Sequence, residues 1–406
     1  MAKSPIDAVV AGLLCLDITP DLSLLTQPVQ LGKVFSPTLL TQVGGATIST
    51  GGAVSNTGLA MRRLGAKVAL MGKCGQDSFG QAVLDFLERE APGSAAATTL
   101  VENEPTSYTI VLSPPGIDRF FLHCPGTNGT FGFADLDLDI ISRARLFHFG
   151  YPPLMKRILA NNGRELIKAY KAVHQLGVTT SLDMTLPDAK SPAGRMKWPN
   201  LLHRLLPHVD LFLPSVEELI FIMSPARFKS MLRKAKGRDL LDNLDLDLVR
   251  QLAEKCLAMG AKVMVVKCGR LGIYCRTASA ERLLDMGKAC PRKKIKDWAD
   301  REIFEPTYKV NRFVSATGAG DCAVAGFLTA LLRGASLPDA LRYSAALGAQ
   351  NVRVLDTVSG TKSWRHTTTQ IRSKSPKASV PVDMTAFKPV RSARHYLGPH
   401  DSLRRD

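Results

Sequence analysis

The residues with the clearest chemical potential lie near the C-terminal end of the chain, in the segment VSATGAGD at Val314–Asp321. The small residues Gly318, Ala319 and Gly320 let backbone N–H groups approach an anion, and a helix that begins there adds the positive end of its dipole. Asp321 at the rim of such a phosphate site could take the proton from a hydroxyl that attacks a terminal phosphoryl group. The alternative is that Asp321 only complements the helix dipole in a tight turn. No Walker A pattern occurs, which argues against a P-loop NTPase.

Two further segments could hold the molecule that carries the hydroxyl. Gly51 and Gly52 permit a tight turn with free backbone donors, and Asn56 can both donate and accept hydrogen bonds. Asp17 follows the first apolar run, where a carboxylate can accept two sugar hydroxyls at once. Each feature alone is typical of a turn or an ordinary helix. Their combination favours a polyol site.

Alternating segments must position these residues. Amphipathic stretches, whose apolar residues recur at three- and four-residue steps, lie at 53–64, 79–89, 165–176, 248–259, 321–332 and 338–354. Short apolar runs that suit strands buried on both faces occur at 8–11, 68–71, 146–149, 179–182, 211–213 and 263–266. The alternation predicts an α/β fold, a three-layer αβα sandwich with a mainly parallel central sheet.

Two segments interrupt this alternation. Residues 18–50 are rich in Thr, Gln, Leu and Pro, and residues 106–123 read as strand, turn and strand. We expect both to form a small β-sheet lid, with segments at about 18–50 and 104–130. In an open parallel sheet the ligand lies beyond the carboxyl ends of the strands, where such a lid would close over it.

Composition limits the class of protein. Of 406 residues 45% are hydrophobic and 22% charged, which excludes wholesale disorder and a polytopic membrane protein. The 53 Lys and Arg exceed the 36 Asp and Glu, so the net charge is +17. Residues 361–406 hold ten of these cations against three acids. We therefore expect one large folded domain at 1–365 and a basic, poorly ordered tail at 366–406.

The same composition bears on partners and location. Aromatic residues make up only 6% of the chain and do not alternate with the basic segments, so we expect at most weak, salt-sensitive binding to nucleic acid and no specific recognition. Eight cysteines without C-x-x-C spacing suit reduced thiols in a cytoplasm. No long apolar run or signal peptide occurs, which predicts a soluble protein without membrane association.

The segments Gly51–Gly75 and Thr317–Asp321, with Asp17 before them, resemble the ribokinase-like (PfkB) carbohydrate kinase family from about residue 7 to about residue 360. The resemblance implies the ribokinase-like fold and phosphorylation of a sugar or nucleoside hydroxyl by ATP with Mg²⁺. Asp321 then matches the catalytic base, and the backbone of Gly318, Ala319 and Gly320 matches the anion hole. The family's sugar-binding positions fall on Asp17, Gly51, Gly52 and Asn56, with Arg119 and Asn128 at the end of the lid.

The resemblance also assigns a nucleotide site. Residues bordering or flanking the nucleotide would be Lys267, Gly269, Gly272, Thr317, Gly318, Gly320, Gly348 and Asn351. Glu218 would serve Mg²⁺, although the family's N-x-x-E stretch begins here with Ser215. Many members have Asp where this chain has Ser315, and since that Asp helps to shape a monovalent-cation loop, its loss argues against K⁺ activation.

Other polar residues near the expected site are weaker candidates. His123 could reach a substrate oxygen, although a lone His beside a hairpin is more often a surface residue, and His148 is typical of a core histidine. Asp183 follows a strand and so lies beside the expected site. A sugar kinase is the first hypothesis; a nucleoside kinase and a non-catalytic sugar or nucleotide sensor are the alternatives. A homodimer formed through the lid is a further expectation that the resemblance brings.

Overall fold

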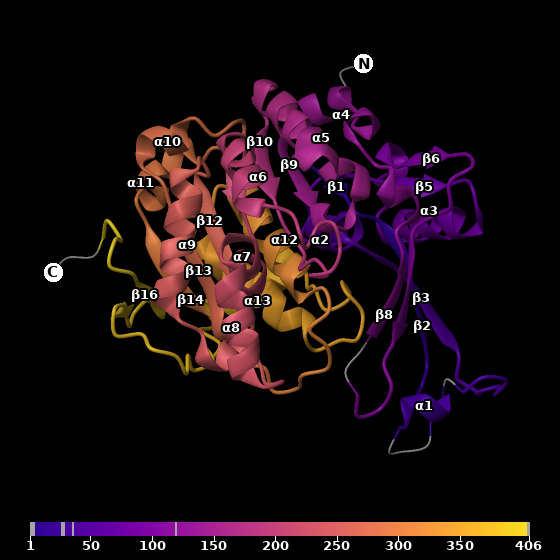
Figure 1. The fold of residues 1–406 in the computed structure, drawn as a ribbon. Helices are drawn as coiled ribbons and strands as arrows, with labels where there is room; N and C mark the ends of the chain where they lie inside the picture. The colour runs from indigo at the N-terminus through magenta and orange to yellow at the C-terminus, as the bar shows by residue number, and fades with distance from the viewer. Residues whose placement is uncertain (1–4, 26–28, 35, 118–119, 404–406) are drawn as a thin grey trace.

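A large twisted sheet forms the centre of the protein (Figure 1). The structure is a computed structural model, and it describes residues 5–25, 29–34, 36–117 and 120–403. Within these residues the strand order is β15-β16-β14-β13-β12-β11-β10-β9-β1-β4. The strands are β1 Ile6–Gly12, β4 Val68–Met71, β9 Ala144–Gly150, β10 Thr179–Leu182, β11 Leu211–Phe212, β12 Val263–Lys267, β13 Gly272–Thr277, β14 Glu302–Pro306, β15 Lys388–Val390 and β16 His395–Leu397. From β4 to β12 neighbouring strands are parallel, and from β12 to β15 they are antiparallel.

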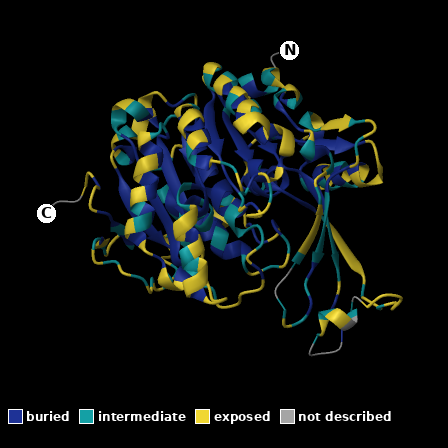
Figure 2. Ribbon diagram, viewed as in Figure 1, coloured by how far each residue is buried: buried dark blue, intermediate teal, exposed yellow. Residues whose placement is uncertain are grey.

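Helices cover both faces of this sheet, as the alternation in the sequence predicts. Within β1, Val9 packs against one apolar cluster and Val10 against the other. The Val9 cluster includes residues of α5 (Lys156–Gln175), α6 (Trp198–Leu205) and α9 (Leu246–Ala258). The Val10 cluster includes residues of α2 (Ala53–Arg63), α12 (Ala319–Leu332) and α13 (Leu337–Asn351). Figure 2 shows the buried sheet between helices that are exposed only on their outer sides.

All six strands expected from apolar runs are present, within one or two residues. Residues 225–239, which include six Lys and Arg, contain a helix, α8 (Pro225–Ala235). Non-helical backbone at 160–163 interrupts α5, and the part of α5 after this break coincides with the amphipathic stretch predicted at 165–176. Strands β13 and β14 were not predicted, because they pair antiparallel beyond the alternating part of the chain. The remaining elements are α1 Leu31–Val34, β5 Lys73–Gly75, α3 Ser78–Glu90, β6 Thr99–Val101, α4 Leu138–Ser142, α7 Val216–Met223, α10 Ala280–Leu284, α11 Ile295–Trp298 and α14 Trp364–Arg372, besides short 3-10 turns.

A separate small sheet forms the expected lid. Its strands are β2 (Cys15–Pro20), β3 (Ala46–Gly51), β7 (Tyr108–Leu112) and β8 (Phe120–Cys124), in the order β3-β2-β7-β8. It projects from the main body on the side that carries the indigo N-terminal segments (Figure 1). Both segments that interrupt the alternation therefore belong to one structure.

The C-terminal segment is not a poorly ordered tail, and this prediction is wrong for the described residues up to 403. Strand β16 pairs with β14 and extends the central sheet. The buried Arg301 guanidinium donates to both carboxylate oxygens of Asp401, at 3.1 and 2.9 Å. Lys377 pairs with the buried carboxylate of Glu305 at 2.5 Å. Basic composition suggested disorder because it does not reveal that acids elsewhere in the chain pair with this segment.

Candidate active site

The loop before α12 has the geometry of an anion site. Gly318 caps the helix with φ +73°, and a β-carbon there would lie 2.4 Å from the backbone oxygen of Thr357, so only glycine fits. The Asn351 side-chain amide donates to the carbonyl oxygen of Thr317 at 2.9 Å. The Ser315 hydroxyl accepts the N–H of Thr317 at 3.1 Å. These contacts fix the loop so that the first turn of α12 begins with Ala319 and Gly320.

Asp321 is the third residue of α12, and its side chain is buried and fully hydrogen-bonded. Asn56 donates to Oδ2 at 3.0 Å, and Thr57 donates to Oδ1 at 3.3 Å. The Tyr151 hydroxyl lies 2.8 Å from both oxygens. Burial raises the pKa of Asp321, whereas the hydrogen bonds from Tyr151 and Asn56 and the charge of Lys267 oppose that rise.

The N-terminal half of the chain brings the predicted sugar-binding residues to the same place. Gly52 caps α2 with φ +88°, and a β-carbon there would lie 2.3 Å from the carbonyl oxygen of Leu13. A β-carbon on Gly51 would lie 2.3 Å from Oδ2 of Asp17, so Asp17 sits directly beside the start of α2. One turn into that helix, Asn56 contacts Asp321. The three segments singled out in the sequence therefore meet.

Asp17 belongs to a polar row on one face of the lid. The strand register places Ser49, Asp17, Thr109 and His123 side by side across β3, β2, β7 and β8. The Thr109 hydroxyl and His123 Nδ1 are 3.0 Å apart. Cys15 donates to Asp17 at 3.4 Å, while burial raises the pKa of Asp17 to about 6. His123 is exposed, as expected, but it lies in the same cross-strand row as Asp17.

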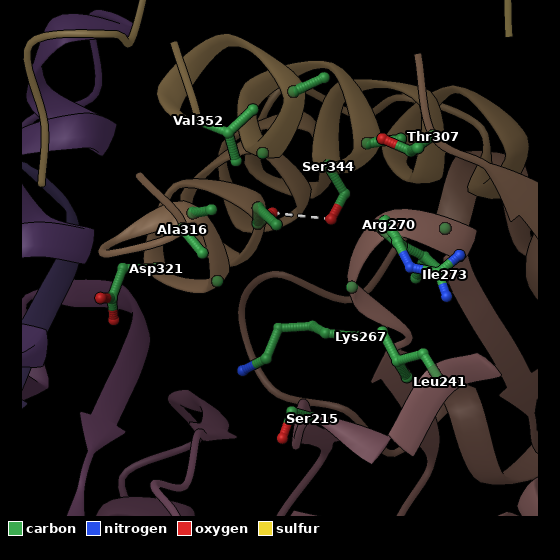
Figure 3. A pocket seen from close by; sticks show the side chains of 18 of the residues that line it. Ser215, Leu241, Lys267, Arg270, Ile273, Thr307, Ala316, Asp321, Ser344 and Val352 are labelled. Carbon is green, nitrogen blue, oxygen red and sulfur yellow. Dashed lines mark hydrogen bonds between the residues drawn. The ribbon is translucent and has the colours of Figure 1, made fainter. Parts of the chain in front are cut away.

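A cavity of about 660 Å³ extends from Asp321 toward the antiparallel half of the sheet. Figure 3 shows Asp321 at one end and Thr307, Arg270 and Ile273 at the other, with the Lys267 side chain between them and its nitrogen toward Asp321. Of the residues predicted to border a nucleotide or its metal ion, those that line the cavity are Lys267, Gly269, Gly272, Gly320, Gly348 and Glu218.

The side chain of Lys267 is mostly buried, and a neighbouring carboxylate balances its charge. Its ammonium pairs with the Asp183 carboxylate and donates to the carbonyl oxygen of Leu213 at 2.7 Å. Burial opposes the charge, but the carboxylates of Asp183 and Glu218 hold the pKa of Lys267 above its ordinary value. Burial raises the pKa of Asp183. This pair puts a cation and a carboxylate on the cavity wall beside Asp321.

The departure at Ser215 has a structural explanation. Ser215 is the N-cap of α7: its hydroxyl accepts the N–H of Glu218 at 3.2 Å, and Glu218 Oε2 accepts the N–H of Ser215 at 2.6 Å. Such a capping box requires a short polar side chain at its first position, which serine supplies as well as asparagine does. Glu218 therefore keeps a fixed place on the cavity wall.

Four predicted residues are placed differently from the expectation. Asn128 is buried, and its amide accepts the N–H of Leu14 at 3.2 Å and donates to the Leu14 carbonyl at 2.9 Å. It thus holds the turn between β1 and β2 rather than facing the cavity. Asn351 supports the loop at Thr317 and does not line the cavity, and neither do Thr317 and Gly318. Arg119 lies outside the described residues.

Three residues of the site, Tyr151, Thr57 and Ala378, are not among those predicted from the sequence. Tyr151 follows the predicted strand at 146–149, so its place at the carboxyl end of the sheet was a usable signal. Thr57 could have been found as the neighbour of Asn56. Ala378 lines the far end of the cavity, where its N–H donates to the Thr307 carbonyl at 2.9 Å, and no local pattern marks it.

No helix within the described residues is long and apolar enough to cross a membrane. The same residues contain no preformed group of three or more His, Cys, Asp or Glu side chains that could hold a metal ion.

Solved structures share this fold. The ribokinase of Arabidopsis thaliana, complexed with ribose and ATP, superposes with a TM-score of 0.65 and 19% identity, over 91% of this chain and 99% of that one. An Escherichia coli structure in complex with ATP and Mg²⁺ gives a TM-score of 0.64 and 20% identity, again over 91% and 99%. The molecule is therefore a ribokinase-fold protein.

The sequence comparison defines the family. The model of the pfkB family carbohydrate kinases matches residues 13–364, and the chain belongs to this family. An uncharacterized sugar kinase of Archaeoglobus fulgidus is 24% identical over 72% of this chain and 94% of its own length. By family the protein is a sugar kinase, a phosphotransferase with an alcohol group as acceptor.

Proposed function

We propose that this protein transfers the terminal phosphoryl group of ATP to a hydroxyl of a sugar, with Asp321 as the general base. The observation that carries the proposal is the position of Asp321. It lies at the N-terminus of α12, in contact with Asn56 of α2, and at one end of a cavity large enough for a nucleotide. The backbone of Gly318, Ala319 and Gly320 would form the anion hole.

The chemistry divides between proton transfer and charge stabilisation. Asp321 accepts the proton of the attacking hydroxyl, and burial suits it to that task because it brings the pKa of the carboxyl closer to neutral pH. The helix N-terminus and the Lys267 ammonium would face the transferring phosphoryl group. The Lys267 side chain lies close to the start of the helix: its Cε would be 3.7 Å from a β-carbon on Gly320. Closure of the lid would exclude water from this step.

The residues present fit ATP and Mg²⁺. The cavity wall includes apolar side chains, as an adenine base requires: Ile273, Val310, Ala345, Ala349 and Val352. Mg²⁺ is commonly held by one or two carboxylates together with substrate phosphates, so the lack of a preformed cluster is compatible with it. Glu218 would be its carboxylate, and the ion would neutralise charge on the phosphate oxygens. Since Ser315 replaces an Asp, we propose activity without K⁺.

The polar lid row favours a sugar over a nucleoside. Ser49, Asp17, Thr109 and His123 offer hydrogen-bonding groups in a line, which suits several hydroxyls rather than the flat apolar face of a base. A nucleoside kinase and a non-catalytic sensor remain the alternatives that an experiment must separate.

ATP consumption measured with pentoses, hexoses, keto-deoxy sugar acids and nucleosides tests the proposal, with Mg²⁺ and with or without K⁺. We expect turnover with at least one sugar, and a loss of about 10²–10⁴-fold in Asp321→Asn. Asp339→Asn is the matched control, because Asp339 is the third residue of α13 and its side chain hydrogen-bonds to Ser336 and Arg342. Equal and small losses in both variants would show that Asp321 merely complements its helix dipole.

We propose further that two copies pair through their lids. The face opposite the polar row carries Ile48, Ile18, Ile110 and Leu122 in register, and Ile48 and Leu122 are more than half exposed. Sedimentation should show a dimer that Ile48→Asp dissociates. Leu232→Asp, on exposed α8, should leave it intact, and a wild-type monomer at high concentration would contradict the proposal.

A further inference from the structure

The hydroxyl of Tyr151 hydrogen-bonds to the carboxylate of Asp321, the proposed general base. It lies 2.8 Å from each oxygen of Asp321, and it is the third donor to that side chain after Asn56 and Thr57. A carboxylate offers about four lone-pair sites. Asn56 donates to one of these sites on Oδ2, and Thr57 donates to one on Oδ1. The Tyr151 hydroxyl lies between the two oxygens and covers the remaining site on each. A sugar hydroxyl that is to give its proton to Asp321 must therefore displace one of these donors.

The backbone places Tyr151 there at a cost in strain. Gly150 ends β9 so close to α2 that a β-carbon on it would lie 2.0 Å from Cβ of Ala53. Tyr151 follows in the left-handed region, at φ +65° and ψ +38°, and Pro152 and Pro153 come next. A side chain other than glycine disfavours this conformation, so its contact with Asp321 helps to hold it.

Tyr151 is the donor that a ligand can replace. Asn56 and Thr57 are buried within the first turns of α2, whose backbone is fixed by helical hydrogen bonds and by packing against α12. Tyr151 instead lies on the short connection after β9, and its half-buried side chain lines the cavity with Asp183 and Lys267. A ligand entering the cavity therefore meets the tyrosine hydroxyl before either α2 donor.

We propose that the Tyr151 hydroxyl holds the place of the sugar hydroxyl on Asp321 in the sugar-free enzyme, and so prevents Asp321 from activating water against ATP. This inference rests on the proposed function. Without the tyrosine hydroxyl a water molecule can bind Asp321, give it a proton and attack the terminal phosphorus. The bond from that phosphorus to the bridging oxygen of ADP then breaks, and ADP and phosphate form.

The first test measures ATP hydrolysis without any sugar, so it does not require the substrate to be known. Tyr151→Phe keeps the ring and removes the hydroxyl, and we expect hydrolysis to rise about ten- to a hundredfold, the range for a hydrogen bond to a charged group. The double variant Tyr151→Phe/Asp321→Asn should lose this increase. Tyr170→Phe is the matched control, because it also removes a buried hydroxyl, one that donates to the Ser181 carbonyl at 2.7 Å.

A second readout is the pH profile of sugar-dependent kcat/KM. The Tyr151 hydrogen bond lowers the pKa of Asp321, so its removal should move the acidic limb of the profile to higher pH. The other charged groups around this pair, Lys267, Asp183 and Glu218, are unchanged in the variant. A purely structural role for Tyr151 would lower stability and activity without shifting the limb.

The outcomes separate this inference from the proposed function. Sugar-dependent turnover in the wild type, with more sugar-free hydrolysis in Tyr151→Phe and a shifted acidic limb, supports both. Sugar-dependent turnover with unchanged sugar-free hydrolysis overturns the role of Tyr151 and leaves the kinase intact. If the wild type consumes no ATP with any of the sugars tested, and Tyr151→Phe also fails to hydrolyse ATP without sugar, the proposed function is wrong. This inference is then wrong as well.

Discussion

Asp17 and Asp321 are both acids of the candidate site, Asp17 half-buried and Asp321 buried, yet their surroundings differ. Asp321 accepts hydrogen bonds from three neutral donors, whereas the contacts of Asp17 are a weak thiol donor and its lid neighbours. Burial therefore dominates at Asp17 and raises its pKa to about 6. An ionised carboxylate is the better acceptor for sugar hydroxyls.

The pKa of Asp17 predicts a pH-dependent affinity for the sugar. Above pH 6 the free protein carries the carboxylate, and below it the carboxyl is protonated, so the Kd should rise by up to about tenfold per pH unit as the pH falls below 6. Calorimetric titration between about pH 5 and pH 8 measures this. Asp17→Asn should bind weakly at every pH, and a wild-type Kd that stays constant would contradict the prediction.

Gly318 and Gly334 provide a matched pair for the anion loop. Both have φ slightly above +70°, but a β-carbon would strike the Thr357 backbone only at Gly318; at Gly334 nothing lies within 4 Å. Gly334→Ala should lower the free energy of unfolding by about 1–2 kcal/mol and leave kcat unchanged. Gly318→Ala should lower it further and reduce kcat, because the loop must move. Urea unfolding measures the stability of both variants, and steady-state kinetics measures their kcat. Equal effects in Gly318→Ala and Gly334→Ala would show that the close approach to the Thr357 backbone is unimportant.

At the level of elements, α7 depends on its capping box. Ser215→Ala should lower stability by about 1 kcal/mol and raise the KM for ATP, since Glu218 loses its fixed position. Ser215→Asn should restore both. Ser363→Ala removes the N-cap of α14, which accepts the N–H of His366, and should reduce stability alone. If both alanine variants change the KM for ATP equally, Glu218 does not contribute to nucleotide binding.

At the level of the whole molecule, the C-terminal segment is part of the kinase body. Asp401→Ala leaves Arg301 buried without its partner, and we expect a loss of about 3–5 kcal/mol in denaturant unfolding. Asp383→Ala, an exposed acid in the same segment, should change stability by less than about 0.5 kcal/mol. Similar values for the two variants would mean that this segment is dispensable. Weak, salt-sensitive binding to nucleic acid stays a prediction, as does a cytoplasmic location.

Local sequence patterns specify the alternating architecture and the neighbourhood of the site. Strands such as 8–11 and 263–266 can be predicted from the sequence because burial on both faces requires continuous apolar residues. Site residues such as Gly51, Gly318 and Asp321 can be predicted because tight turns and helix starts restrict residue types locally. These constraints act within a few residues, so no partner from elsewhere is needed to read them.

Which distant groups share the site depends on the folding of the whole chain. Tyr151 joins Asp321 across 170 positions, Lys267 meets Asp183 across 84, and Ala378 closes the cavity from a segment whose composition suggested disorder. Asn128 and Asn351 matched a motif but hold backbone instead. A side chain's role depends on what the fold brings within hydrogen-bonding distance, and sequence spacing does not encode that distance for residues on different elements.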